Sequence, residues 1–151
     1  MSRNKKVRNA KPTEKYGIKF KSNLESLCYE KLINNGFEPE YENKKFVLFD
    51  GFKMNNNISI YMPKRQRCKA RELMEEYKKK ILPITYTPDF YLNVNGINVF
   101  IETKGKPNDA YPLKKKMFFY ALNENNEQTI FFEPHNEAQI DQLIDMLYEL
   151  S

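Results

Sequence analysis

Apolar and polar residues alternate most clearly in the stretch from Thr85 to Gly105, TYTPDFYLNVNGINVFIETKG. Two runs rich in β-branched and aromatic residues, which favour strands, lie on either side of Asn95-Gly96. Asn-Gly is the strongest short-range signal for a two-residue type I′ turn between antiparallel strands. This stretch is therefore predicted to form a β-hairpin.

The turn also sets which residues of the predicted hairpin face each other. If Val94 pairs with Ile97, the same register pairs Leu92 with Val99, Phe90 with Ile101 and Asp89 with Glu102. The period-2 alternation of a strand puts Lys104 on the face of Glu102 and Thr103 on the other face. Directly opposed carboxylates repel each other, so we expect a cation between Asp89 and Glu102. The opposite face of the hairpin is the apolar one.

The remaining elements follow from the same kind of pattern. Helices are predicted at Lys21–Asn35, Pro63 to about Ile81, Pro112 to about Asn123 and Asn136–Leu150, and strands within Phe37–Phe49, at Ile58–Met62 and at Thr129–Phe132. The expected inward-facing residues of the first, third and fourth helices are Leu24, Leu27, Cys28 and Leu32, then Leu113, Met117, Tyr120 and Ala121, then Ile140, Leu143, Ile144 and Leu147. This order predicts an α/β (α+β-like) fold with a mixed central β-sheet flanked by helices, and the length suits a single domain over residues 1–151.

The composition is that of a folded chain without a membrane span. Hydrophobic residues make up 40% of the chain and aromatic residues 14%, although the mean hydropathy is −0.76. No apolar run approaches the roughly 18 residues of a membrane span, and the basic N-terminus lacks the apolar core of a signal peptide. We therefore expect a cytoplasmic protein.

Several other chemistries find no support in the sequence. Cys28 and Cys68 lack the spacing of a metal site, and the single histidine cannot complete a zinc site, so both cysteines are expected to be reduced thiols. The chain has no Gly-rich phosphate loop followed by Lys-Ser or Lys-Thr, and no convincing Ser-His-Asp set. NTPase and serine hydrolase functions are therefore excluded.

The residue types of Asp89, Glu102 and Lys104 indicate phosphodiester hydrolysis. Two carboxylates suit a hard divalent ion such as Mg²⁺, whose other ligands are then waters and the substrate phosphate. A neighbouring lysine can orient or help to deprotonate the attacking water, or stabilise charge on the phosphate. The plainer alternative is a solvated polar face in which Lys104 is an ion-pair partner that contributes roughly 0 to 1 kcal/mol.

Pro88-Asp89, twelve intervening residues and Glu102-Thr103-Lys104 resemble the signature of the PD-(D/E)XK nuclease superfamily. Within it, the chain is similar to small phage-encoded nucleases, including the endonuclease I type that resolves Holliday junctions. The similarity runs from about Gly17 to Leu122, through GIKFKSNLE, YTPDF, IETKG and a Lys-rich helix from Pro112. It implies a restriction-endonuclease-like fold, a bacterial or phage-infected host cell, and a place for Glu25 in the acidic cluster.

Glu25 also has a structural explanation. Ser22-Asn23-Leu24-Glu25 is a capping box, in which the glutamate satisfies an amide at the helix N-terminus. Both roles stay open.

On these grounds we expect a metal-dependent endodeoxyribonuclease that uses Mg²⁺ or Mn²⁺. The expected metal ligands are Asp89, Glu102, Glu25 and the Thr103 carbonyl, and Lys104 is the expected catalytic base or orienting group. The resemblance implies DNA as the partner, with branched or junction DNA first, and it leaves a homodimer open. The rivals are a DNA-binding or recombination accessory module that cuts poorly, and a sequence-specific restriction-type endonuclease.

Charge is unevenly distributed along the chain, whose net charge is +5. Met1–Ser22 holds eight Lys or Arg residues against one acid, whereas Ala121–Ser151 holds seven acids and no Lys or Arg. A basic arm at about residues 1–20 is typical of a disordered tail or of a nucleic-acid contact, and beside a nuclease motif we favour phosphate binding. The basic helical insertion at about residues 63–82 is either a solvated helix or an element that tracks DNA. The candidate DNA-binding residues are Lys19, Lys21, Lys64, Arg65, Arg67, Lys106, Lys114 and Lys115.

Overall fold

The structure, a computed structural model, describes residues 12–65, 71–77, 80–105 and 108–151. In chain order its elements are β1 (Thr13–Lys15), β2 (Ile18–Phe20), α1 (Asn23–Asn34), β3 (Glu40–Tyr41), β4 (Phe46–Phe49), β5 (Tyr61–Met62), β6 (Glu75–Glu76), β7 (Ile84–Tyr86), β8 (Phe90–Val94), β9 (Ile97–Ile101), α2 (Tyr111–Asn125), β10 (Thr129–Phe132) and α3 (Glu137–Leu150). The chain falls into two compact units, of which unit 1 comprises Met1–Phe46 and Tyr86–Ser151, and unit 2 comprises Val47–Thr85. All the predicted catalytic residues belong to unit 1.

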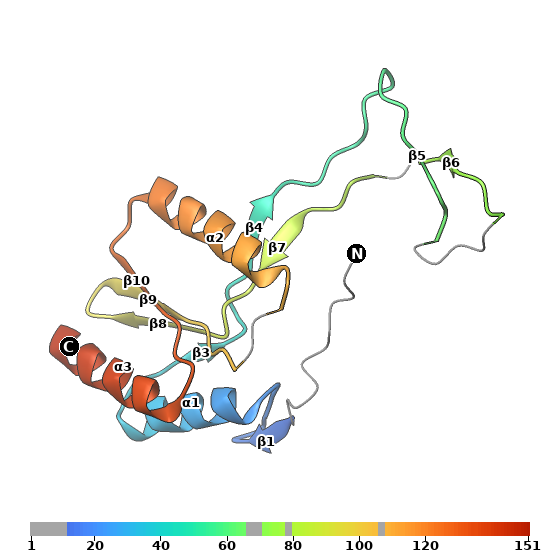
Figure 1. The fold of residues 1–151 in the computed structure, drawn as a ribbon. Coiled ribbons are helices and arrows are strands. Elements are labelled where there is room, and N and C mark those ends of the chain that lie inside the picture. The colour runs from blue at the N-terminus through green and yellow to red at the C-terminus, as the bar shows by residue number, and fades with distance from the viewer. Residues whose placement is uncertain (1–11, 66–70, 78–79, 106–107) are drawn as a thin grey trace. The chain divides into compact units, whose positions relative to one another are not determined.

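Unit 1 is built around a mixed four-stranded sheet with the strand order β10-β9-β8-β3 (Figure 1). The predicted hairpin is confirmed as β8 and β9, with Val94 opposite Ile97 as expected. Asn95 and Gly96 have φ angles of 51° and 84°, and a type I′ turn requires positive φ at both positions. β10 lies parallel to β9 and β3 antiparallel to β8, so the predicted α/β class with a mixed sheet is confirmed.

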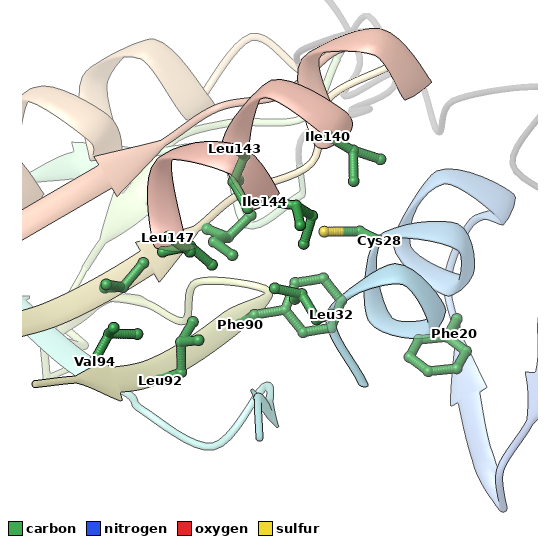
Figure 2. Packing of buried hydrophobic residues seen from close by; sticks show 12 residues of the cluster. Phe20, Cys28, Leu32, Phe90, Leu92, Val94, Ile140, Leu143, Ile144 and Leu147 are labelled. Carbon is green, nitrogen blue, oxygen red and sulfur yellow. The ribbon is translucent and has the colours of Figure 1, made fainter. Parts of the chain in front are cut away.

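One face of this sheet carries the main apolar core (Figure 2). Its buried members are Phe90, Leu92, Val94, Val99 and Ile101 from the hairpin, Cys28 and Leu32 from α1, Ile140, Leu143, Ile144 and Leu147 from α3, and Phe20 from β2. The predicted inner face of α3 and the apolar face of the hairpin are therefore confirmed. On α1, Leu24 and Leu27 are partly buried against the same core.

The other face of the sheet is covered by α2 (Figure 1). The buried residues of α2 are Tyr111 and Phe118, and the Phe118 ring contacts that of Phe100, with 5.5 Å between the ring centres. The predicted inward positions were wrong for Leu113 and Tyr120, which are 61% and 68% exposed. The segment YPLKKKMFFYAL is apolar on more than one side, so its spacing alone did not select the face that meets the sheet.

Capping residues set the ends of the two helices that pack on the core. Ser22 is the N-cap of α1 and accepts a hydrogen bond from the Glu25 backbone N–H, and Asn136 caps α3 by accepting from Gln139. After α1, Gly36 adopts a φ of 83°, a left-handed conformation that ends the helix at little cost for glycine. The cap at Ser22 was predicted, and it places Glu25 in the first turn of α1.

The predicted basic arm at about residues 1–20 overlaps a pair of strands. Residues 1–11 lie outside the described residues, but β1 and β2 form an antiparallel pair that begins at Thr13. Tyr16 and Gly17, with φ angles of 55° and 73°, make the turn between them. Because Phe20 in β2 is fully buried, this pair is part of the core of unit 1.

Unit 2 has no helix among its described residues, so the prediction of a helix from Pro63 to about Ile81 is wrong there. Instead β5 pairs antiparallel with β6, and β4 pairs with β7. Leu73 and Met74, expected to pack inward, are 85% and 64% exposed. With Tyr77 they span about one helical turn, too short a stripe to hold a long helix against a core. Across the described chain, no helix is long and apolar enough to cross a membrane.

Candidate functional site

Two buried carboxylates lie together at the open end of the β8-β9 hairpin. β8 begins at Phe90 and β9 ends at Ile101, so Asp89 and Glu102 are the next residues beyond the last strand pair. Asp89 is 8% exposed and Glu102 is 4% exposed. The backbone N–H of Asp89 donates to Glu102 Oε2 at 3.3 Å. The hairpin therefore brings these two predicted site residues into contact.

The Glu102 carboxylate is held from both sides. The Tyr86 hydroxyl donates to Oε2 at 2.7 Å, and Lys104 Nζ lies 2.5 Å from Oε1. Burial, followed by the charge of Glu102 and the hydrogen bond to it, raises the pKa of Tyr86, so the phenol stays protonated and remains a donor. Lys104 contributes the charge that compensates Glu102, and the predicted convergence of these two residues is confirmed.

Asp89 is bound by Thr103. The Thr103 backbone N–H and its hydroxyl both donate to Asp89 Oδ2, each at 2.8 Å. The expectation that the Thr103 side chain points away from the carboxylates was wrong, because β9 ends at Ile101 and strand alternation does not extend to position 103. Beyond the strand, the backbone continues to follow the segment after β10, since Lys104 N–H donates to the Pro134 carbonyl at 3.0 Å.

Asp89 lies beside other carboxylates and, unlike Glu102, has no ion pair with Lys104. Burial, the charge of Glu102 and the charge of Glu25 raise the pKa of Asp89 to about 8, although the hydrogen bonds from Thr103 act in the opposite direction. A carboxylate is stabilised in its ionised form when a cation is near. Lys104 pairs with Glu102, so Asp89 is the carboxylate whose charge is left to be offset.

Glu25 acts as a cap in this structure. Its carboxylate accepts hydrogen bonds from the Lys21 backbone N–H at 3.1 Å, the Ser22 hydroxyl at 3.1 Å and the Tyr41 hydroxyl at 2.7 Å. It is 7% exposed, and its charge contributes to the raised pKa of Asp89. The two proposed roles are therefore compatible: the Glu25 carboxylate binds the start of α1 through the Lys21 N–H and the Ser22 hydroxyl, in place of the Ser22 N–H of a standard capping box, and it adds negative charge near Asp89.

The donor chemistry of the site fits a hard divalent cation. Within the described part of the chain, Asp89 accepts hydrogen bonds on Oδ2 only, both from Thr103. Mg²⁺ commonly takes one or two protein carboxylates, and Asp89 with Glu102 offers two. Within the described ranges, however, no three His, Cys, Asp or Glu residues are grouped so as to hold a metal ion. Among the described residues the fold thus brings two carboxylates together, and it does not form the cluster of three that was expected.

A second polar cluster beside the site was missed from the sequence. Glu133 directly follows β10, whose last pair with β9 is Phe132 with Ile101, so Glu133 lies beside Glu102. Glu133 accepts hydrogen bonds from the Tyr111 hydroxyl at 2.5 Å and from Lys115 Nζ at 2.9 Å. Partial burial raises the pKa of Glu133, but hydrogen bonds from Tyr111, His135 and Lys115 outweigh it and lower the pKa to about 2. The sequence predicted β10 but not its pairing with β9, which is the information that places Glu133 here.

The predicted DNA-binding cations occupy separate places. Lys19 and Lys21 lie just before α1, Lys114 and Lys115 lie near the start of α2, Lys64 and Arg65 follow β5 in unit 2, and Arg67 and Lys106 lie outside the described residues. Two of them are paired with acids, Lys21 with Glu42 and Lys115 with Glu133. The lysine of the Lys21–Glu42 pair is exposed, whereas Lys115 and Glu133 are both partly buried.

A groove elsewhere in unit 1 does not coincide with the carboxylates. It lies between β10 and α3, has a volume of about 640 Å³, and is lined by residues that include Phe132, Glu133, His135, Leu143 and Met146. Concave apolar pockets are the usual first candidates for binding sites. This groove contains neither Asp89 nor Glu102, and we place the site at the hairpin end because the buried charges are there.

Comparison with known proteins adds no relative of this chain. No protein-family model, no curated protein and no solved structure matches it. The case for a function therefore depends on the residues and geometry of the site.

Proposed function

We propose that the protein is a metal-dependent endodeoxyribonuclease. The observation that carries this proposal is the buried pair of Asp89 and Glu102, held in contact at the end of a hairpin with Lys104 at 2.5 Å from Glu102. Burying two adjacent carboxylates costs stability unless a positive charge compensates them. One lysine compensates one of them, and a divalent cation is the simplest partner for the other.

In this proposal the residues have separate roles. Asp89 and Glu102, with the Thr103 carbonyl, would hold Mg²⁺ or Mn²⁺, and the charge of Glu25 would add to the negative charge at Asp89. The bound cation would supply positive charge to the phosphodiester during hydrolysis. Lys104, kept next to Glu102 as an ammonium group, orients the attacking water by hydrogen bonding and stabilises the charge that develops on the phosphate.

The substrate class is the next step of the proposal. The resemblance to phage junction-resolving nucleases favours branched DNA, acted on in the cytoplasm of a bacterium or an infected host cell, by a homodimer if a second copy is needed. Phosphate contacts would come from Lys19 and Lys21 beside α1, from Lys114 and Lys115 on α2, and from Lys64 and Arg65 in unit 2.

The proposal is tested by incubating purified protein with linear duplex, single strand, flap and four-way junction in Mg²⁺, Mn²⁺ or EDTA. Wild type should cleave at least one substrate with either metal and none in EDTA. Asp89→Asn and Glu102→Gln should abolish cleavage and still bind DNA. Asp145→Asn removes an exposed carboxylate of α3 and should cleave like wild type. Equal cleavage by Asp89→Asn and Asp145→Asn would remove the site assignment.

A second candidate function is a DNA-binding accessory module that cuts little or not at all. It is favoured by one observation, that the described residues do not bring a third carboxylate into the metal site. Binding to junction DNA by anisotropy, with no product in either metal over long incubation, would support this function instead.

A further inference from the structure

We propose that Tyr111 is a positioning residue that fixes the Lys104 ammonium group against Glu102, an inference that rests on the proposed nuclease function. Lys104 Nζ lies 4.3 Å from the centre of the Tyr111 ring and 2.5 Å from Glu102 Oε1. A cation over an aromatic face is attracted by the quadrupole of the ring. Lysine is a point charge on a flexible four-carbon chain, so a single ion pair leaves its direction poorly defined. The ring supplies the second contact.

Tyr111 is itself held from several sides. It is 5% exposed, its backbone N–H donates to Asn108 Oδ1 at 2.8 Å, and its hydroxyl donates to Glu133 Oε1 at 2.5 Å. Its ring also contacts that of Tyr86, with 6.4 Å between the ring centres. Anchored at the start of α2 and at the end of β10, the ring is a fixed surface against which Lys104 rests.

The same ring lies next to a second cation. Lys115 Nζ is 5.2 Å from the ring centre and 2.9 Å from Glu133 Oε1. Each lysine therefore has its own carboxylate, Lys104 with Glu102 and Lys115 with Glu133, and Tyr111 contacts both ammonium groups. Among the described residues, the contacts of the Lys104 ammonium group are Glu102 and the Tyr111 ring, so without the ring its direction toward the reacting phosphate would depend on the ion pair.

Two substitutions separate the ring from the hydroxyl. Tyr111→Phe keeps the ring over Lys104 and loses only the hydrogen bond to Glu133, whereas Tyr111→Leu removes the ring. With a cleaved DNA substrate, Tyr111→Leu should lower kcat by at least about tenfold, a part of the roughly 10²- to 10³-fold that a preorganised charge-stabilising donor contributes, with KM within about twofold. Tyr111→Phe should restore kcat to within about threefold of wild type.

A double-mutant cycle tests whether Tyr111 acts through Lys104. In a Lys104→Ala background, Tyr111→Leu should cause no further loss of kcat, because the residue that it positions is gone. Independent losses that multiply in the double variant would overturn the proposal, as would a Tyr111→Phe variant that is as slow as Tyr111→Leu. If Tyr111→Leu fails to fold by circular dichroism, Tyr111→Met replaces it as a ring-free variant.

An NMR measurement that does not depend on cleavage tests the contact between Lys104 and Tyr111 separately from the nuclease proposal. In protein labelled with [ε-¹³C]lysine, the Lys104 methylene signal is assigned by its absence in Lys104→Arg. It should be shifted by the ring current in wild type and Tyr111→Phe, and should move to the position of a free lysine in Tyr111→Leu. An unmoved signal would overturn the placement of Lys104 by Tyr111. If wild type does not cleave but the signal behaves as expected, the nuclease proposal fails and the contact stands.

Discussion

A buried carboxylate that is repelled by its neighbours makes the folded state less stable whenever it is ionised, and Asp89 is such a residue. It is near Glu102 and Glu25, and the adjacent lysine is paired with Glu102. An unfolded chain lets the same aspartate ionise at a pKa of about 3.9. The ionised form of Asp89, which the proposed metal binding needs, is therefore the form that the fold disfavours.

This residue predicts a pH dependence of stability. The pKa of Asp89 is raised to about 8 in the folded state, so folding favours its protonated form. Its contribution is most favourable below the unfolded pKa of about 4, and it declines as pH rises toward 8. Compared with Asp89→Asn, wild type should therefore lose free energy of unfolding between pH 5 and 8 by at least about 1 kcal/mol.

Urea unfolding in EDTA at several pH values measures this difference, and comparing wild type with Asp89→Asn cancels the other titrating groups. Asp145→Asn, an exposed site, should show no such trend. Adding Mg²⁺ at pH 8 should raise the stability of wild type more than that of Asp89→Asn, because a ligand that binds only the folded state stabilises it. A pH-independent difference would mean that burial and the neighbouring carboxylates do not raise the pKa of Asp89 in the folded state.

At the scale of elements, local sequence signals predicted those parts of the fold that depend on neighbours in the chain. Asn95-Gly96 specified the turn, the turn specified the register, and the register placed Asp89 and Glu102 together. Ser22 and Asn136 likewise marked the first turns of α1 and α3. In each case the determining interaction lies within a few residues.

What the sequence could not predict depends on contacts between distant segments. The parallel pairing of β10 with β9 brings Glu133 beside Glu102, and no local pattern encodes that pairing. The burial of Tyr111 follows from the face of α2 that meets the sheet, which a helix apolar on several sides does not specify. For this reason the sequence did not predict that Tyr86, Tyr111 and Glu133 belong to the site.

The exposure of Leu73 in unit 2 predicts that this side chain contributes little to stability. Its described residues include none that is buried, and Leu73 there is 85% exposed, whereas Leu143 in α3 is 2% exposed. Leu73→Ala should change the free energy of unfolding by less than about 0.5 kcal/mol, and Leu143→Ala should lower it by about 2 to 5 kcal/mol. Urea denaturation of both variants measures the two free energies of unfolding for the same Leu→Ala substitution. A large loss for Leu73→Ala would show that this side chain is covered in solution, for instance by a second copy of the chain.

At the scale of the whole molecule, charge is sorted along the sequence. Residues 1–11 carry five of the eight Lys or Arg residues of Met1–Ser22, and the C-terminal segment Ala121–Ser151 is acidic. The structure describes the chain from Pro12, and β1 begins at Thr13. Lys15, within β1, is 3.0 Å from Glu30 of α1. A deletion that tests the basic arm should therefore end at Lys11, so that the β1-β2 pair is left intact.

Deleting residues 1–11 should weaken DNA binding without changing the catalytic site. Each phosphate contact releases condensed counterion, so the logarithm of the binding constant falls with the logarithm of salt concentration by roughly 0.9 per contact on duplex DNA. Removing five cations should make that slope shallower by up to about 4.5. Fluorescence anisotropy across a salt series gives the slope, and a full-length variant with the same five cations replaced by glutamine controls for chain length. Light scattering on both proteins reports mass. An unchanged slope at unchanged mass would show that the arm does not bind phosphate, whereas loss of a dimer in the deletion but not in the glutamine variant would make it an assembly element.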